Sequence, residues 1–199
     1  MERLAEVVKV SDRKRRIVVF TSVNSPLMYD YGQAEVGTVA AELGFPVLIN
    51  STGVAGVTAP VTLAGALAQM NAELLGALVV IQLHRPGTPV LYAGHPMVMD
   101  MKTGMPSHGF SELGLATAAF IDIGRSYGLP TSSPGLMTDS CSSDAMAASE
   151  KWATGYPPVM AGADVSGGGG GLACQSTISL EQLVFDDDLY GCMFAHVQG

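Results

Sequence analysis

The chain alternates short apolar runs, rich in β-branched residues, with longer segments whose apolar positions recur at helical spacing. Runs of the first kind begin near residues 16, 46, 89, 129 and 158. Each is followed by a loop rich in Gly, Ser, Thr, Asn or Asp and then by a helix-period segment. Such alternation predicts an α/β protein with a parallel sheet and helical crossovers.

The same pattern predicts where each element lies. Strands are expected over residues 17–22, 46–50, 89–93, 129–133 and 158–163. Helices are expected over residues 2–9, 32–43, 111–126 and 143–154, from a cap at Thr58 to about Leu83, and from the capping box Ser179–Gln182 toward Phe194. The 17 residues from Gly94 to Phe110 are expected to form one long loop, and loops of that length tend to be functional.

The spacing of the strands also bounds the architecture. One strand–helix unit takes roughly 35 residues here, so the eight units of a closed (β/α)₈ barrel would need roughly 280. The chain has 199 residues. We therefore predict an incomplete TIM-type barrel of about five parallel βα units, forming a single domain over residues 1–199.

Composition narrows the possible partners and the compartment. Hydrophobic residues make up 48% of the chain and charged residues 14%, which suggests surfaces buried against other protein. The net charge of −8 argues against a nucleic-acid partner. Three cysteines without CxxC spacing, and no secretory signal, predict a cytoplasmic location.

One long uncharged stretch invites a membrane interpretation. No charged residue occurs between Glu42 and Glu73, but Pro46 and Pro60 and the loop residues over 51–58 interrupt the stretch. No uninterrupted apolar run of about 18 residues exists. A buried helix is therefore expected, and no membrane partner.

Ligands of parallel α/β proteins bind at the carboxyl ends of the strands. This rule nominates Asn24, Ser25, Tyr29, Asn50, Ser51, His95, Met99, Asp100, Lys102, Thr138, Asp139, Ser140 and Cys141. For His95 a ligand-binding role and a purely structural role both remain open. His84 and His108 lie near predicted helix boundaries and are expected to be structural.

Patterns with metal- or phosphate-binding potential are weak in this chain. His95, Asp100 and His108 match no fixed ligand spacing, so no metal site is predicted. The run Asp186–Asp188 lies in a predicted helix, where successive side chains point about 100° apart, and it is expected to form a solvated acidic face. The run Gly167–Gly171 lacks the lysine of a phosphate loop, and it is expected to be a flexible loop at the rim.

Several segments together resemble one known family. They are Gly56–Gly65 (GVTAPVTLAG), Asn71–Glu73, Arg85–Val90, Met99–Gly104, Tyr127–Pro130, Thr138–Ser140 and Leu183–Asp187, and they occur in family order. The chain resembles the trimethylamine–corrinoid methyltransferase family. The resemblance implies a (β/α)₈-type barrel that moves a methyl group from a methylated amine to the cobalt of a separate corrinoid protein. Family members extend beyond this chain at both ends, so the chain resembles their central portion.

The family has two branches, one with pyrrolysine in the barrel and one without it. The pyrrolysine position is expected within residues 138–144, at Cys141, and no pyrrolysine occurs in this sequence. The chain therefore resembles the second branch, whose known members use quaternary amines such as glycine betaine. A quaternary ammonium already has a neutral amine as its leaving group, so the site need not supply a proton.

The resemblance and the strand-end rule together assign provisional roles. A permanent cation is held well by carboxylates and aromatic faces. We expect catalytic roles for Asp100 and Asp139 and substrate contacts from Ser25, Tyr29, His95, Lys102 and Cys141. Tyr92 and Phe110 are further aromatic candidates. No cofactor is expected to bind directly, because cobalamin would be carried by the corrinoid partner, and the full-length protein is expected to be a homo-oligomer.

Two other interpretations stay open. The chain could be a different TIM-barrel enzyme that acts on a phosphorylated metabolite, for which the run Gly167–Gly171 is the one supporting feature. It could also be an inactive truncated fragment, because a barrel without some of its strands exposes open edges and apolar faces. On the sequence alone we expect the isolated chain to associate through those edges and to show no methyl transfer.

Overall fold

The structure is a computed structural model that describes residues 17–198. The helix predicted over residues 2–9 lies outside the described residues. The central sheet contains β1 (Val19–Val23), β2 (Val47–Ser51), β4 (Val90–Gly94), β7 (Thr131–Ser133) and β8 (Val165–Ser166). The helices between and after them are α2 (Tyr31–Leu43), α3 (Leu63–His84), α4 (Ser111–Ser126), α5 (Ala145–Met160) and α6 (Leu180–Gln198).

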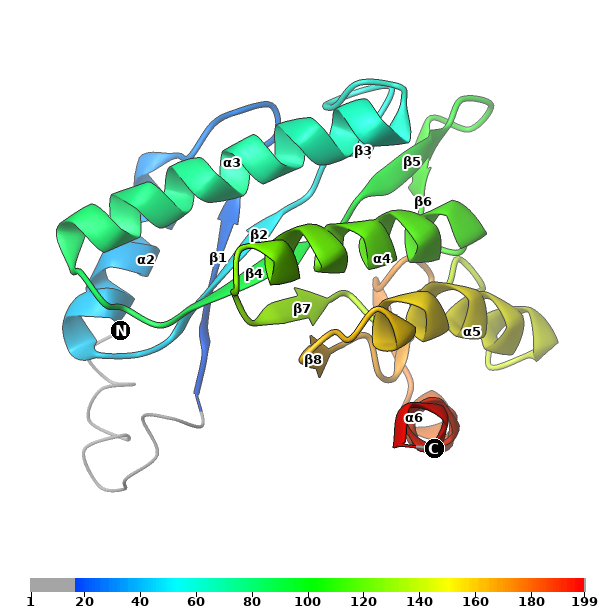
Figure 1. Ribbon diagram of the computed structural model, residues 1–199. Helices are drawn as coiled ribbons and strands as arrows, with labels where there is room; N and C mark the ends of the chain where they lie inside the picture. Colours follow the sequence, from blue (N-terminus) through cyan, green and yellow to red (C-terminus); the bar gives the residue numbers. More distant parts are fainter. Residues whose placement is uncertain (1–16, 199) are drawn as a thin grey trace.

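The sheet order β1-β2-β4-β7-β8 follows the chain, and every neighbouring pair is parallel. Successive helices contact one another from α2 to α6, and α3 and α4 lie side by side along the sheet (Figure 1). An unbroken βα order of this kind is consistent with part of a TIM-like barrel. The predicted parallel sheet is confirmed, and the first four predicted strands overlap observed ones.

The prediction of a strand over residues 158–163 is wrong. Helix α5 continues to Met160, through Pro157 and Pro158, and the fifth strand is β8. Pro157 has no N–H for the carbonyl four residues earlier, that of Ala153. Helix α4 packs on this exposed carbonyl, because a Cβ built on Gly114 would lie 2.1 Å from the Ala153 oxygen. Packing against α4 therefore keeps the proline-containing end helical.

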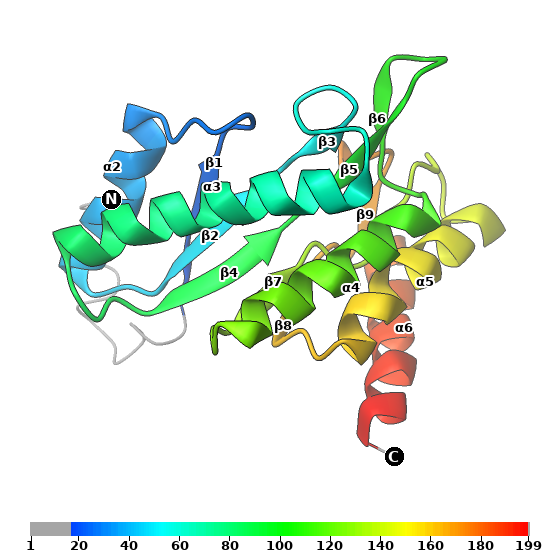
Figure 2. The same cartoon turned by 45° about the horizontal axis from the view of Figure 1, so that its top comes forward.

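The loop predicted from Gly94 to Phe110 is in part a β-ribbon. Strands β5 (Met97–Asp100) and β6 (Met105–Ser107) pair antiparallel, and β5 also pairs with β3 (Val54–Ala55). The ribbon projects past the end of the main sheet (Figure 2). A short hairpin of β9 (Gly171–Leu172) and β10 (Thr177–Ile178) precedes α6.

The helix ends show which local signals the sequence carries. Asp30 caps α2, and Gly44 ends it with φ of 79°. Thr62 caps α3 instead of the predicted Thr58. At α6, Ser179 Oγ accepts a hydrogen bond from the Gln182 backbone N–H at 3.1 Å, which is one half of the predicted capping box. The other half is absent, because the Ser179 N–H donates to Gly170 O and the Gln182 side chain donates to Asp186.

The main core lies between the sheet and helices α2, α3 and α4. Its buried side chains include Val19, Val23, Ala40, Phe45, Val47, Ile49, Met70, Leu74, Ile81, Val90, Tyr92 and Phe120. Helix α3 is long and apolar enough, by length and composition, to cross a membrane. In the structure one face of α3 supplies part of this core, while Val79 and Leu83 are exposed on the other. The predicted burial of this helix is therefore confirmed for one face.

Gly94, where β4 ends, provides a test of the core packing. A Cβ built there would lie 2.2 Å from the Phe120 ring, and Phe120 is itself stacked on Tyr92 at 4.7 Å. We expect Gly94→Ala to lower the free energy of unfolding by about 1–3 kcal/mol, because the core must shift to accept the methyl group. Urea denaturation followed by circular dichroism measures it.

Gly76→Ala is the matched control. Gly76 lies within α3 with nothing within 4 Å of a Cβ built there, so alanine should stabilise the helix by up to about 1 kcal/mol. Equal effects of the two substitutions would contradict the packing described here.

Candidate functional site

Four side chains meet at the carboxyl ends of β4 and β7. His95 directly follows β4, and His108 directly follows β6. Asp139 lies in the segment between β7 and α5, and Cys174 follows β9. One ligand atom from each of His108, Asp139 and Cys174 lies within 4.8 Å of the others. We call these four residues the His–Asp–Cys cluster.

The Asp139 carboxylate joins the cluster to its surroundings. Its Oδ1 accepts hydrogen bonds from the backbone N–H of His108 at 2.7 Å and from the Cys174 thiol at 3.0 Å. Its Oδ2 accepts one from the Ser107 hydroxyl. Burial alone would raise the pKa of Asp139, but these hydrogen bonds outweigh it and hold the pKa below its ordinary value. Asp139 is therefore an ionised carboxylate at neutral pH.

The Cys174 thiol is held against Asp139 by a strained backbone. Ala173, Cys174 and Gln175 all have positive φ angles, from 50° to 64°, a conformation that costs a non-glycine residue about 1–2 kcal/mol. Two backbone hydrogen bonds fix the segment: Ala173 N–H to Ser140 O at 2.8 Å and Cys174 N–H to Thr138 O at 3.0 Å. Burial, followed by the hydrogen bond to Asp139 and its charge, raises the pKa of Cys174 to about 12.

The two histidines of the cluster are neutral. Their ring centroids lie 5.0 Å apart, with the rings edge to face. Burial, and then the neighbouring His108, lower the pKa of His95 to about 3. Burial also lowers the pKa of His108, although the charge of Asp139 opposes this shift. His95 Nε2 and His108 Nδ1 are buried and find no hydrogen-bond partner among the described residues.

Helix α5 positions the Asp139 segment through Glu150. The Glu150 carboxylate accepts hydrogen bonds from the Thr138 hydroxyl at 2.5 Å and from the Asp139 backbone N–H at 2.9 Å. The same carboxylate lies against Gly109, where a Cβ would come within 2.4 Å of the carboxyl carbon. Glycine at position 109 therefore allows the His108 segment and α5 to approach each other.

The structure separates the two aspartates that the sequence nominated together. Asp100 lies at the exposed turn of the β5–β6 ribbon, where its carboxylate accepts hydrogen bonds from Lys102 N–H at 2.9 Å and Thr103 Oγ1 at 2.7 Å. These bonds lower the pKa of Asp100. In the ribbon Asp100 pairs with Met105, two residues nearer the tip than Ser107. Asp100 and the exposed Lys102 thus lie at the ribbon turn, and Asp100 is not part of the cluster.

The other nominated residues take different positions. Cys141 is exposed, two residues beyond Asp139, with its sulfur 4.0 Å from the Asp139 carbonyl oxygen. Tyr29 lies near β1, where its hydroxyl is 3.2 Å from Thr21 Oγ1 and burial raises its pKa. Tyr92 is 2% exposed in the core and cannot face a ligand. Phe110 is 48% exposed, two residues beyond His108.

Ser25 is engaged by a buried carboxylate, that of Glu73 on α3. Glu73 accepts hydrogen bonds from Ser25 Oγ at 2.7 Å, Ser51 Oγ at 2.5 Å, the Leu27 N–H at 2.9 Å and Gln69 Nε2 at 3.0 Å. These bonds tie the segment after β1 to the end of β2. The Ser25 hydroxyl therefore has a structural role here, and its predicted substrate contact remains untested.

The expectation of a solvated acidic face is wrong for Asp186. Its carboxylate forms a buried ion pair with Lys151 of α5 at 2.8 Å, and the two side chains are 1% and 0% exposed. Asp186 also accepts a hydrogen bond from the Gly170 N–H at 2.7 Å. Asp187 and Asp188 are exposed, as expected.

The run Gly167–Gly171 is held by hydrogen bonds and is not an open loop. Gly168 O accepts from Lys151 Nζ, Gly167 O accepts from the Leu136 N–H, and the Gly170 N–H points at Asp186. The protein's own carboxylate thus takes the place of an external anion. This removes the one feature that supported a phosphate-binding barrel.

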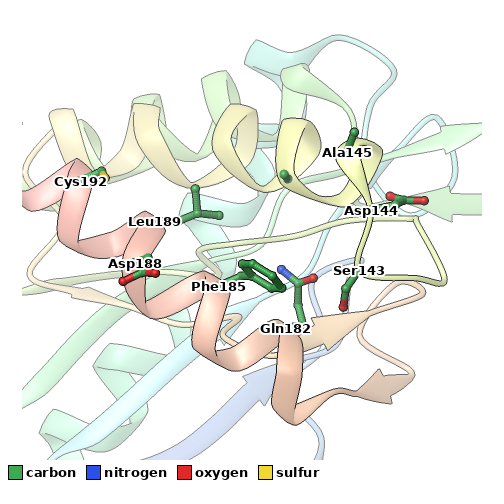
Figure 3. Close-up of a pocket in the computed structure, with 9 residues that line it drawn as sticks. Ser143, Asp144, Ala145, Gln182, Phe185, Asp188, Leu189 and Cys192 are labelled. Atoms are coloured by element: carbon green, nitrogen blue, oxygen red, sulfur yellow. The ribbon is translucent and has the colours of Figure 1, made fainter.

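An apolar groove of about 440 Å³ lies between α5 and α6, beyond the Asp139 segment. Phe185 and Leu189 of α6 line it opposite Ala145 of α5 (Figure 3). Ala148 of α5 also lines the groove. Ser143 and Asp144 line its end, and they follow Cys141 in the chain. One end of the groove is therefore formed by the same segment between β7 and α5 that contains Asp139.

A family described as trimethylamine methyltransferase (MTTB) matches residues 1–199. The chain belongs to this trimethylamine methyltransferase family. It is 37% identical over 175 residues to the trimethylamine methyltransferase MttB of Methanosarcina thermophila, covering 88% of this chain and 36% of the relative. It is 34% identical over 189 residues to the glycine betaine methyltransferase of Desulfitobacterium hafniense, covering 94% of this chain and 40% of the relative.

The family assignment confirms the resemblance found in the sequence. The trimethylamine methyltransferase MttB of Desulfitobacterium hafniense is also similar, at 37% identity over 165 residues, which is 83% of this chain and 33% of the relative. The chain thus spans between a third and two fifths of the length of these relatives.

The buried Lys151–Asp186 pair provides a second test. We expect Lys151→Met to lower the free energy of unfolding by about 3–5 kcal/mol, because it leaves the Asp186 carboxylate buried without its counter-charge. The double variant Lys151→Met/Asp186→Leu should lose less than the single one. Urea denaturation midpoints measure both.

The exposed His84–Glu42 pair serves as the control for this test. Its nitrogen and oxygen are also 2.8 Å apart, but the side chains are 39% and 59% exposed. Glu42→Gln should leave the midpoint nearly unchanged. A Lys151→Met variant as stable as Glu42→Gln would show that the ion pair does not hold α5 to α6.

Proposed function

We propose that this chain forms part of a TIM-type barrel that moves a methyl group from a quaternary amine, such as glycine betaine, to a separate corrinoid protein. Membership of the family supports methyl transfer as the class of reaction. The observation that carries the site is the ionised Asp139 carboxylate, beside two neutral imidazoles, at the carboxyl ends of parallel strands. Ligands of parallel barrels bind at this end.

The barrel part of the proposal rests on strand order and on the exposed sheet face. Five parallel strands follow one another in chain order, and the relatives are long enough to supply further units. Val19 and Val23 of β1 face the helices, so Phe20 between them points to the opposite face. Phe20 is 58% exposed, as expected for a residue that further barrel strands would cover.

The electrostatics of the cluster favour a quaternary over a tertiary amine. When a neutral tertiary amine loses a methyl group, the leaving group is an amide anion unless a proton is supplied. When a quaternary ammonium loses a methyl group, the leaving group is a neutral amine. His95 and His108 have lowered pKa values, so neither is an imidazolium acid at neutral pH, and the raised pKa of the Cys174 thiol makes it a weak acid. The absence of pyrrolysine and the presence of Cys141 at its expected position agree with this preference.

The residues of the chain then take these roles. Asp139 attracts the cationic ammonium, and the exposed Phe110 ring offers an aromatic face beside it. Asp100, Lys102 and His95 keep the roles expected of them from the sequence, Asp100 and Lys102 from the ribbon turn and His95 from the end of β4. The corrinoid partner supplies the reduced cobalt that accepts the methyl group. The chain's own task is to align the N–CH₃ bond with that acceptor.

A chimeric enzyme tests the proposal in a complete barrel. The matching segment of the Desulfitobacterium hafniense glycine betaine methyltransferase is replaced by this chain, and methylation of a reduced corrinoid protein is followed by absorbance. We expect turnover with glycine betaine and much less with trimethylamine. Asp139→Asn should slow the reaction at least about tenfold, which corresponds to about 1.4 kcal/mol of lost transition-state stabilisation.

Asp122→Asn is the control, because Asp122 is exposed on α4 away from the cluster. It should leave the rate unchanged. Turnover of trimethylamine alone would refute the substrate assignment, and equal rates for the Asp139 and Asp122 variants would refute the site.

A further inference from the structure

We propose that the His–Asp–Cys cluster binds one divalent transition-metal ion, of the Zn²⁺ class, through His108, Asp139 and Cys174, with His95 as the fourth donor. No ligand spacing along the chain predicts such a site. The proposal goes beyond methyl transfer and does not depend on it.

The donor atoms suit zinc in kind and in separation. A thiolate sulfur, imidazole nitrogens and a carboxylate oxygen are the usual ligands of Zn²⁺. With zinc–ligand bonds of 2.0–2.3 Å, donors of a tetrahedral site lie about 3.5 Å apart. The three donor atoms here already lie within 4.8 Å of one another, and Cys174 Sγ is 3.0 Å from Asp139 Oδ1. Side-chain shifts of about 1 Å would therefore bring these three donors to tetrahedral spacing.

Unpaired buried nitrogens give a second, independent indication. His95 Nε2 and His108 Nδ1 are both buried and without a partner among the described residues. A buried polar atom without a hydrogen bond costs about 1–3 kcal/mol, and such atoms in native proteins call for an explanation. Two of them in rings 5.0 Å apart, beside a thiol and a carboxylate, are explained by a shared cation.

Hydrogen bonds from the surrounding residues hold the proposed ligands in place. Ser107 Oγ and the His108 N–H fix the Asp139 carboxylate. The left-handed run at Ala173–Gln175 aims Cys174 inward, and its backbone hydrogen bonds to Thr138 and Ser140 anchor the run. Backbone strain of this kind persists where the surrounding structure fixes it, commonly at functional sites.

Binding of the ion would replace a proton. The S–H bond of Cys174, now directed at Asp139, breaks and its proton passes to solvent, while the sulfur electron pair binds the metal. A divalent ion with one thiolate and one carboxylate has no net charge, whereas the metal-free cluster carries the charge of Asp139. The metal ion and a cationic substrate would therefore compete for the cluster.

Metal content is the direct test. The 199-residue chain is purified without chelator, equilibrated with Zn²⁺, dialysed and measured by plasma mass spectrometry. We expect about one zinc per chain, and less than about a tenth of that in Cys174→Ser, because the thiolate is the strongest ligand. Cys192→Ser is the matched control, because Cys192 is an exposed cysteine on α6, and it should retain the ion.

Cobalt substitution and thermal unfolding distinguish loss of the metal ligand from misfolding of a variant. Co²⁺ should give thiolate charge-transfer absorption in the wild type and in Cys192→Ser, but not in Cys174→Ser. Zn²⁺ should raise the Tm of the wild type and leave the Tm of a folded Cys174→Ser or Asp139→Asn unchanged. His95→Ala should weaken zinc binding at least about tenfold, or about 1.4 kcal/mol.

Three results would overturn the proposal. They are a wild type with no more zinc than Cys174→Ser, equal loss of zinc in Cys192→Ser, and cobalt spectra without a thiolate band. Unchanged affinity in His95→Ala would overturn the fourth ligand. These measurements do not depend on methyl transfer, so an inactive chimera would leave the metal-binding proposal unaffected.

Discussion

The carboxylate of Asp139 is the interaction on which the carboxyl end of this sheet depends. It accepts hydrogen bonds from the end of β6 and from the Cys174 segment, and its own backbone N–H is held by Glu150 of α5. Three segments far apart in the sequence thus meet on one half-buried anion. Without it, a backbone N–H and a hydroxyl would lose their partner at a cost of about 1–3 kcal/mol each.

Two buried carboxylates, those of Glu73 and Asp186, also accept hydrogen bonds from distant segments, but their surroundings differ from those of Asp139. Glu73 is surrounded by four neutral donors, and Asp186 is neutralised by Lys151. Asp139 has no cationic partner in the described part of the chain, and unpaired imidazole nitrogens lie beside it. Its charge is therefore available to a ligand, either a substrate cation or a metal ion.

Much of the fold could be predicted, because its signals are local. β-branched runs followed by loops rich in Gly, Ser, Thr, Asn or Asp marked the first four strands and their helices. The fifth strand was misplaced because Pro157 and Pro158 suggest a helix end, whereas packing on Gly114 keeps the segment helical. The burial of Asp186 depends on Lys151, 35 residues earlier, and no local pattern reveals such a partner. Similarly, the strand-end rule found His95 and Asp139, but Cys174 reaches the site only through backbone hydrogen bonds to Thr138 and Ser140.

A crystal structure of the metal-free protein with glycine betaine bound tests the central claim most directly. The account predicts that the trimethylammonium group lies against the Asp139 carboxylate, beside His95 and Phe110. Glycine betaine bound elsewhere, with Asp139 still hydrogen-bonded only to Ser107, His108 and Cys174, would contradict it.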